Sequence, residues 1–450
     1  MVAIAFGLPR YSESRWQRVS LVLYRIVIGL LAPLFLLQLA WRARIERSGT
    51  IDLAARFGFG AALAEDTVWI HAVSVGEVQA AAPLVFALRE RHPDVTIVVT
   101  CVTPTGMAHA RRLFADPKVN LRFLPLDLPS AVRRFLDRIR PRVGIVLETE
   151  IWPQLFVECG DREIPIVLAS ARLSERSVAR YRRFAALWQR SMATHVQIAA
   201  QSDIDAERFR SLGVPPERVS TSGNLKFDFS PPATAIAQRE ALRNLYPMEG
   251  RFVWIAASTH EGEESAVLAT QQRLRSAGLD AFLIIAPRHP RRFESVANLI
   301  EQSGLKWCRG SQLQSGLQQT PLRDDVSVIL LDTMGDLLAH YGLAKAAFVG
   351  GSWVPVGGHN LLEPITMGCA TLTGPHLFNS PEIARNLSMS GAVKIVADAH
   401  ELEDQLVLLA QDASEGDRRG DRARAQLDSS RGSTQRVLAL VEARLDRTAA

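Results

Sequence analysis

Short apolar runs alternate with longer segments of helical periodicity from Asp66 to about residue 400. Six runs in the first half have the length of buried strands: TVWIHAVS, VTIVVT, NLRFLPLD, VGIVLET, IPIVLAS and HVQIAAQ. Six more follow in the second half: RFVWIAAS, AFLIIAP, VSVILLD, AAFVGG, ATLTG and VKIVAD. Strands that alternate with helices predict a parallel sheet covered on both faces. The chain is therefore expected to be an α/β protein with two Rossmann-like, doubly wound domains facing a cleft.

The two runs of strands are separated by a segment without strand pattern. FSPPATAIAQ contains Pro231 and Pro232, which indicate a connection between domains. We predict an apolar segment with its flanks at residues 1–48, a first domain at 49–228, a linker at 229–245 and a second domain at 246–450. The second domain would carry the C-terminal helices. Residues 309–323, rich in Gln, Ser and Leu, are expected to form an exposed loop.

The N-terminal segment from Leu21 to Trp41 reads LVLYRIVIGLLAPLFLLQLAW and is interrupted by a single charge, Arg25. About 20 apolar residues span a bilayer, so the segment suffices if Arg25 reaches the headgroups. WRARIER follows in place of a small-residue cleavage site, which favours a retained anchor over a secretory signal. A membrane anchor, spanning or half-inserted, is predicted, with the remaining chain in the cytoplasm. A buried or in-plane helix is the alternative.

The composition narrows the function classes further. The net charge of +5 over 450 residues is too small to indicate nucleic-acid binding. Of the 52 basic residues, only five are lysines, and arginine is the better fork for phosphate and carboxylate groups. The four cysteines are widely spaced, without CxxC or a Cys/His cluster, so neither a disulfide framework nor a zinc site is expected.

In the first half, charged residues stand out at three places. Glu77 opens a helix after HAVSVG and is either a helix-start glutamate or a general base. Glu148 and Glu150 end an apolar strand, where alternation would point both to one face, as a salt-bridged pair or as functional groups. Lys226 in GNLKFD is either a surface lysine or a cation that offsets charge on a leaving phosphate.

The second half carries groups suited to an anionic ligand. Arg288 follows a strand and is a phosphate fork or a solvated cation. DTMGDL presents backbone amides at Met334, Gly335 and Asp336. FVGGSWVPVGGHNLLEP is a strand, a glycine-rich loop and a helix expected to start near Asn360 with free N–H groups. Glu363 would receive ribose hydroxyls or serve as a first-turn carboxylate. The Asp203 and Asp205 pair is interpreted as a helix cap rather than a metal motif.

These blocks together resemble one family. HAVSVGE, TPTG, ETEIWPQL, ARLSERS, GNLKFD, ASTHEGEE, PRHPRRF, DTMGDLL, FVGGSWVPVGGHNLLEP and GPHLFN are similar to blocks of the 3-deoxy-D-manno-octulosonic acid (Kdo) transferases of lipopolysaccharide synthesis. The resemblance implies a GT-B type fold and an inverting reaction without metal or other cofactor. It further implies CMP-Kdo as donor, the lipid A precursor lipid IVA as acceptor, the first domain for the acceptor and the second for the donor. The protein would be located at the inner membrane, with its catalytic domains on the cytoplasmic side.

The resemblance also assigns roles to residues. Glu77 would be the catalytic base, and Glu148 and Lys226 would stabilise the transition state. CMP would be bound by the following residues: Pro287, Arg288, Met334, Gly335, Asp336, Asn360, Leu361, Leu362 and Glu363. Asp336 and Leu361 depart from the family's usual glutamate and proline. A sugar-nucleotide epimerase of similar fold and a non-catalytic membrane-tethered nucleotide-binding scaffold are the alternatives. The number of Kdo units added does not follow from the sequence.

Overall fold

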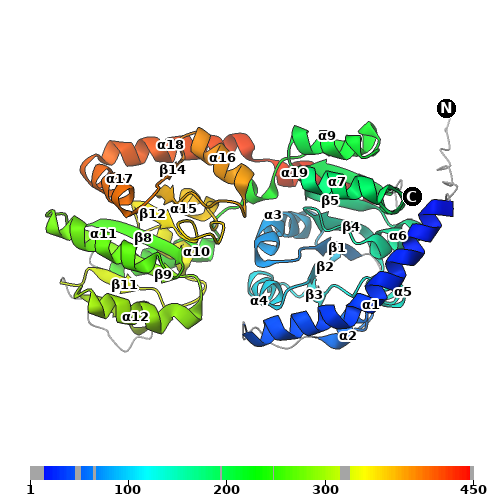
Figure 1. Ribbon diagram of the computed structural model, residues 1–450, viewed down its shortest axis with the longest axis horizontal. Helices are drawn as coiled ribbons and strands as arrows, with labels where there is room; N and C mark the ends of the chain where they lie inside the picture. Colours follow the sequence, from blue (N-terminus) through cyan, green and yellow to red (C-terminus); the bar gives the residue numbers. More distant parts are fainter. Residues whose placement is uncertain are drawn as a thin grey trace. The chain divides into compact units, whose positions relative to one another are not determined.

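The computed structural model describes residues 15–45, 52–63, 67–192, 195–246, 248–314 and 325–445. The chain forms two compact units (Figure 1). Unit 1 comprises Met1–Phe229 and Ser430–Ala450, and unit 2 comprises Ser230–Ser429. Each unit contains one seven-stranded sheet in which all strands are parallel. The predicted α/β class with two Rossmann-like sheets is confirmed.

The sheet of unit 1 has the strand order β3-β2-β1-β4-β5-β6-β7. Its strands are β1 (Thr67–His71), β2 (Thr96–Cys101), β3 (Val119–Phe123), β4 (Pro141–Leu147), β5 (Ile166–Ala171), β6 (Val196–Ala200) and β7 (Val219–Thr221). Its helices are α1 (Arg15–Ile45), α2 (Leu53–Arg56), α3 (Val75–Arg91), α4 (Pro104–Leu113), α5 (Pro129–Ile139), α6 (Pro153–Asp161), α7 (Glu175–Arg183), α8 (Ala185–Ser191), α9 (Asp203–Ser211), the 3₁₀ turns η1 (Pro216–Arg218) and η2 (Leu225–Asp228), and α19 (Ser433–Leu445).

The sheet of unit 2 has the strand order β10-β11-β9-β8-β12-β13-β14. Its strands are β8 (Phe252–Thr259), β9 (Ala281–Pro287), β10 (Trp307–Arg309), β11 (Val328–Leu330), β12 (Ala346–Val349), β13 (Ala370–Thr373) and β14 (Val393–Ile395). Its helices are α10 (Ala233–Leu245), α11 (Glu264–Ser276), η3 (Pro290–Arg292), α12 (Phe293–Gln302), α13 (Gly310–Gln314), α14 (Leu337–Tyr341), α15 (Leu362–Thr366), α16 (Pro381–Met389), α17 (Ala399–Gln411) and α18 (Ala413–Ser430).

The strands are apolar runs because both faces of each sheet are covered. Successive residues Val68 and Trp69 of β1 are both fully buried and belong to different core clusters, one on each face. Trp254 and Ile255 of β8 divide in the same way between the two clusters of unit 2. A strand with helices on both sides has no solvent face, so polar residues concentrate where the strands end.

Several boundaries differ from the expected ones. The strands β7 and β10 were not predicted, because their three residues lie in the polar segments RVSTSG and KWCRG rather than in an apolar run. The expected linker at 229–245 contains the helix α10 of unit 2. The second domain was expected to continue to residue 450, but α19 packs on α3 and β4 of unit 1. Val437, Leu438 and Val441 join the core of unit 1, and burial of this apolar stripe decides where the helix belongs. The expected exposed loop at 309–323 is wrong in its described part, because Arg309 ends β10 and residues 310–314 form α13, where Leu313 is buried. Residues 315–323 lie outside the described residues.

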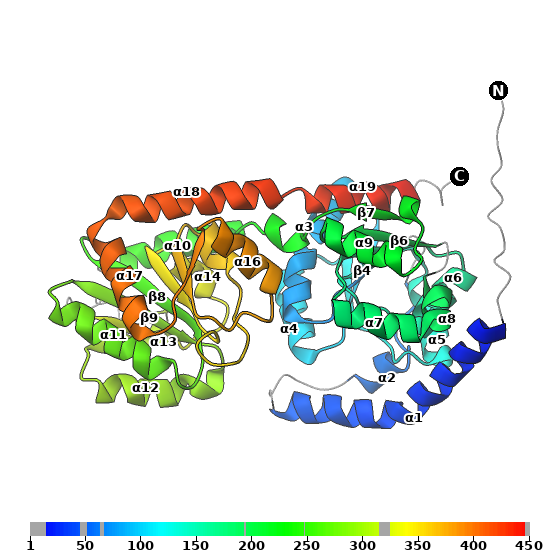
Figure 2. The same ribbon diagram turned by 45° about the horizontal axis from the view of Figure 1, so that its top comes forward.

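The N-terminal helix α1 lies along unit 1 and contacts α6 and α8 (Figures 1 and 2). The Tyr24 hydroxyl donates to Asp127 at 2.7 Å, and Nε of Arg25 donates to Oε1 of Gln154 at 2.7 Å. Arg25 was expected to reach lipid headgroups, but this hydrogen bond directs it to the protein. The opposite face of α1 is apolar and exposed: Val19, Val22, Leu23, Ile26, Val27, Leu30, Leu34 and Leu37. The helix therefore has one docked face and one unpaired apolar face.

Candidate active site

In unit 1, the strand order reverses between β1 and β4. The chain adds β2 and β3 on one side of β1 and then returns to place β4 on the other side. In parallel sheets, ligands bind beyond the carboxyl ends of the strands at such a switch point. Glu77 follows β1 and Glu148 follows β4, so both carboxylates occupy this position.

Glu77 lies in the first turn of α3 and is 9% exposed. One carboxylate oxygen accepts the backbone N–H of Val73 at 2.8 Å, and the other accepts the Ser74 hydroxyl at 3.2 Å. The pKa of Glu77 is raised to about 7, chiefly by burial and also by the charges of Glu148 and Glu150, while the two hydrogen bonds oppose the change. A carboxylate with a pKa near neutrality is suited to take up a proton during a reaction.

Glu148 forms an ion-paired cluster with two cations. Its Oε1 lies 2.7 Å from Nζ of Lys226, and its Oε2 lies 3.5 Å from Nε of Arg172. Burial would raise the pKa of Glu148, but the two cations hold it below its ordinary value. Glu148 has a φ of +55°, and β4 ends at Leu147. The expectation that Glu148 and Glu150 share one face by strand alternation is therefore wrong, because the backbone leaves the β conformation at Glu148.

The segment that carries Lys226 is fixed from two sides. The side chain of Asn224 accepts the N–H of Lys226 at 3.0 Å, and Oγ of Ser170 accepts the N–H of Leu225 at 2.8 Å. Asp228 accepts the N–H of Gly432 at 2.7 Å and that of Thr434, at the start of α19. Asp228 thus caps the start of α19, and this contact together with those of Asn224 and Ser170 holds the segment of Lys226 in place.

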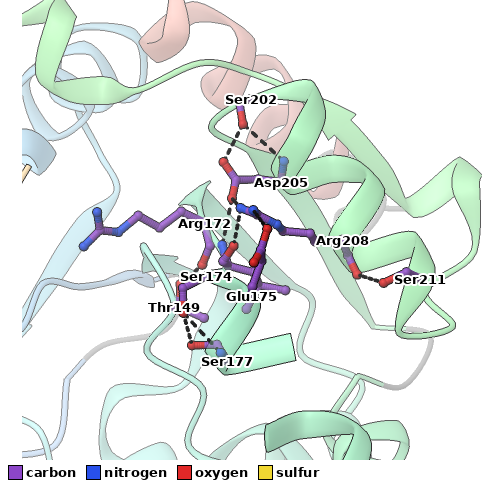
Figure 3. A network of polar contacts seen from close by, with 10 residues as sticks. Thr149, Arg172, Ser174, Glu175, Ser177, Ser202, Asp205, Arg208 and Ser211 are labelled. Atoms are coloured by element: carbon purple, nitrogen blue, oxygen red, sulfur yellow. Dashed lines mark hydrogen bonds and ion pairs between the residues drawn. The ribbon is translucent and has the colours of Figure 1, made fainter. Parts of the chain in front are cut away.

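The loop after β5, which carries Arg172, is held by polar contacts on its far side (Figure 3). The Thr149 hydroxyl donates to the carbonyl of Arg172, and the N–H of Leu173 donates to the buried Asp205 at 2.8 Å. Asp205 also accepts the Ser202 hydroxyl at 2.6 Å. The N-cap of α9 is Ser202, so the interpretation of Asp203 and Asp205 as the cap is wrong. Figure 3 shows the Arg172 side chain pointing away from these contacts.

In unit 2, the switch point lies between β8 and β12, and a buried glutamate organises it. Glu263 is fully buried and accepts four backbone N–H groups, those of His260, Gly351, Ser352 and Trp353, at 2.8–3.0 Å. A Cβ at Gly350 would lie 2.7 Å from Oε2 of Glu263 and 2.9 Å from Cα of Thr259. The glycine-rich loop therefore needs Gly350 so that the backbone can approach the β8 turn.

Arg288 follows β9 and donates its backbone N–H to the carbonyl of Thr259 at 3.0 Å. His260 and His359 stack with their rings nearly parallel, and their Nε2 atoms lie 2.8 Å apart. The pKa of His359 is lowered to about 3, chiefly by burial and also by the charge of Arg288. Burial raises the pKa of Glu363, and hydrogen bonding from Asn360 and the charge of Arg288 oppose the change. Arg288, His359 and Glu363 thus occupy one electrostatic neighbourhood.

The remaining predicted ligands of CMP lie on neighbouring loops. Met334 is exposed, and Gly335 has a φ of +104°. The Asp336 carboxylate accepts a hydrogen bond from Nε2 of Gln238 at 2.8 Å. Pro287 ends β9.

The helix expected near Asn360 begins at Leu362 and has five residues. Asn360 itself accepts the N–H of Leu362, and the side chains of Leu361 and Leu362 are buried. This segment therefore offers a ligand fewer free amides than expected.

Four residues that organise these sites were not singled out as functional from the sequence: Arg172, Asp228, Glu263 and His359. All four lie in blocks of the family resemblance, namely ARLSERS, GNLKFD, ASTHEGEE and FVGGSWVPVGGHNLLEP, but no role was assigned to them. Contacts such as that of Arg172 with Glu148 join residues that are distant in sequence. Within the described parts of the chain, no group of three or more His, Cys, Asp or Glu side chains is arranged to hold a metal ion.

Two doubly wound parallel sheets, with charged residues at the carboxyl ends of their strands, define a protein of the GT-B architecture. Comparison with known proteins agrees. Residues 52–229 match the family described as 3-deoxy-D-manno-octulosonic-acid transferase (kdotransferase). The chain is 38% identical over 399 residues to the 3-deoxy-D-manno-octulosonic acid transferase of Haemophilus influenzae, covering 88% of this chain and 92% of that protein. It is 34% identical to that of Bordetella pertussis, covering 93% and 98%. The chain belongs to the Kdo transferase family and is a glycosyltransferase.

A solved structure shows the same fold at greater distance. UDP-GlcNAc 2-epimerase from Neisseria meningitidis matches with a TM-score of 0.56 and 13% identity, covering 85% of this chain and 100% of that chain. This likeness concerns the fold alone. The sequence relatives confirm the predicted family and enzyme class. The roles of individual residues stay predictions.

Proposed function

We propose that the protein transfers Kdo from CMP-Kdo to lipid IVA by an inverting, metal-independent reaction in which Glu77 is the general base. The observation that carries this proposal is a pair of carboxylates at one switch point with opposite pKa shifts. The pKa of Glu77 is raised to about 7, whereas that of Glu148 is lowered beside Lys226. Such a division assigns proton transfer to one carboxylate and electrostatic stabilisation to the other.

The reaction would proceed as a single displacement. Glu77 takes the proton of the acceptor hydroxyl as its oxygen forms a bond to the anomeric carbon of Kdo. The bond between that carbon and the phosphate oxygen of CMP breaks, and CMP leaves with the electron pair. Attack on the face opposite the leaving group inverts the configuration. Glu77 then releases its proton to water.

The charged neighbours would stabilise the charges that develop. Glu148 faces the positive charge that accumulates on the sugar, and Lys226 offers a cation to the departing phosphate. In unit 2, Arg288 would hold the phosphate, with the backbone at Pro287 and at Met334, Gly335 and Asp336. The segment Asn360 to Glu363 would bind the nucleoside. Leu361 and Leu362 would contribute through their backbone, since their side chains are buried.

The apolar face of α1 supports attachment to a membrane, as a lipid acceptor requires. Arg15–Gln38 is long and apolar enough to cross a bilayer, which by itself is weak support. Trp16 and Trp41 are exposed near its two ends, where interfacial tryptophans lie. The contacts of Tyr24 and Arg25 with unit 1 favour a helix that keeps one face on the protein and inserts the other into one leaflet. We propose the cytoplasmic side of the inner membrane as the location.

The decisive experiment is incubation of the purified protein with CMP-Kdo and lipid IVA in the presence of EDTA, with products weighed by mass spectrometry. Addition of one or more Kdo masses supports the proposal, and the count gives the number of units transferred. Recovery of unchanged lipid IVA under all conditions contradicts it. Turnover that EDTA abolishes and a divalent cation restores contradicts the metal independence alone.

A further inference from the structure

A cavity of about 170 Å³ lies between α1 and the carboxyl edge of the first sheet. Helix α1 contributes Ala32 and Phe35 to its lining, among other apolar residues. Val102 and Leu124 contribute from the segments directly after β2 and β3, and Trp152 contributes from the segment after β4. The cavity thus exists because α1 docks on unit 1.

The polar groups of this lining are nearly all engaged. Asp127 accepts the Tyr24 hydroxyl and the N–H groups of Gln154 and Leu155. The buried Arg56 donates to the carbonyls of Leu124 and Val102 through its two terminal nitrogens. Within the described part of the chain, Nε of Arg56 and Nε1 of Trp152 are buried without a hydrogen-bond partner. The rest of the lining is mainly apolar.

The cavity adjoins the segment that positions Glu77. The N–H of Val102, which lines the cavity, donates to the carbonyl of Val73 at 3.2 Å. The N–H of Val73 in turn donates to the Glu77 carboxylate at 2.8 Å. Trp152 lies four residues after Glu148 in the chain. Two backbone hydrogen-bond donors, those of Val102 and Val73, thus connect the lining of the cavity with the Glu77 carboxylate.

We propose that this cavity binds part of an acyl chain of the lipid acceptor. The inference rests on the proposed function and specifies how its acceptor is held. An apolar cavity of about 150 Å³ lined by aliphatic and aromatic side chains stays dry and binds apolar molecules. At about 170 Å³, this cavity is smaller than the ~300 Å³ that drug-sized ligands need, and it suits a short alkyl segment. The exposed apolar face of the same helix would bring the chain there directly from a leaflet.

Filling the cavity tests the proposal. Ala32→Phe places a ring in it, whereas Ala40→Phe makes the same change on the same helix at an exposed position. Kinetics are measured with lipid IVA and with its deacylated disaccharide. We expect Ala32→Phe to raise KM for lipid IVA about tenfold at unchanged kcat, and Ala40→Phe to change nothing. Rates with the deacylated acceptor should be the same in all three proteins. An unchanged KM in a folded Ala32→Phe protein that still transfers Kdo overturns the inference and leaves the proposed function intact.

A second measurement does not depend on any variant. Lipid IVA with a diazirine on an acyl chain is photolysed with the wild-type protein, and the labelled peptides are mapped by mass spectrometry. Labelling of residues 28–35 and 124–127 that unlabelled lipid IVA competes away supports the proposal. Labelling elsewhere, or equal competition by phosphatidylethanolamine, overturns it, the latter because the cavity would then hold a membrane lipid. Absence of transfer by the wild-type protein would count against the proposed function instead.

Discussion

Nζ of Lys226 lies 2.7 Å from Oε1 of Glu148, although the two residues are 78 positions apart in the chain. The pair brings the turn after β7 to the end of β4, beside the buried carboxylate of Glu77. Because the cation lowers the pKa of Glu148 while burial raises that of Glu77, the two carboxylates differ in charge near neutral pH.

Replacing Glu77 by glutamine should lower kcat by about 10²–10⁴, the usual contribution of a general base. The amide retains the shape of the side chain but takes up no proton. Binding of CMP, measured by calorimetry, should be unchanged. Glu90→Gln is the matched control, because Glu90 is exposed on the same helix α3 and should retain full activity. Wild-type turnover by Glu77→Gln would remove Glu77 from its role.

The rate should depend on pH through the same group. Glu77 acts as a base only when ionised, and its pKa is about 7. The kcat/KM should therefore rise with pH through about 7 and then level off. A pH profile of initial rates with CMP-Kdo and lipid IVA checks this. A profile that is flat from pH 5.5 to 8 would exclude a base with this pKa.

Stability should show the opposite dependence at Glu77. Its folded-state pKa lies above the ordinary value of 4.5, so the neutral carboxyl favours the folded state. Ionisation therefore reduces stability progressively as the pH rises from about 4.5 to about 7. Glu77→Gln, which cannot ionise, should exceed the wild type in stability at pH 8 by on the order of 2 kcal/mol. Urea unfolding at pH 5 and pH 8 measures this, and an equal difference at both values would contradict it.

Replacing Lys226 by methionine should affect both stability and catalysis. Glu148 would keep only the longer contact with Arg172, so about 1–2 kcal/mol of unfolding free energy should be lost. The kcat should fall by about 10² or more, as for loss of a group that stabilises developing charge. Lys118→Met, at an exposed lysine, is the control. An unaltered kcat in Lys226→Met would show that the ion pair of Lys226 and Glu148 has a structural role only.

Arg288→Ala should weaken CMP binding by about tenfold or more, because a charge-assisted contact to phosphate contributes about 1.5–3 kcal/mol. Calorimetry with CMP as the ligand measures this without the acceptor. Arg385→Ala removes the same charge from an exposed position of α16 and should bind CMP normally. Equal affinity for CMP in both variants would show that Arg288 does not bind the phosphate.

Attachment to lipid should depend on the exposed face of α1. Leu30 and Leu34 are 74% and 62% exposed, so Leu30→Gln with Leu34→Gln should not disturb the core. We expect this double variant to sediment less with vesicles of phosphatidylethanolamine and phosphatidylglycerol than the wild type. Ser20→Gln, on the docked half of the helix, serves as a polarity-matched comparison. Equal sedimentation of all three proteins would contradict insertion of this face.

Much of the fold followed from local pattern. Strands buried on both faces must be apolar along their length, so β1, β4, β8 and β12 stand out in the sequence without reference to any partner. The position of Glu77 followed as well, because a carboxylate that opens a helix after a buried strand must lie at the carboxyl edge of a parallel sheet. The edge strands β7 and β10 lie in polar segments and therefore gave no such signal.

What the sequence alone determined was therefore the two sheets, their helices and the edge at which the charged residues gather. The tertiary structure decided which charges meet: Lys226 with Glu148, Asp228 with the start of α19, and Arg25 with Gln154. It also decided that the last helix returns to unit 1 and that α1 docks over a cavity. The periodicity of apolar residues indicates which positions of each helix or strand are buried. Which distant polar groups pair with one another depends on the tertiary fold.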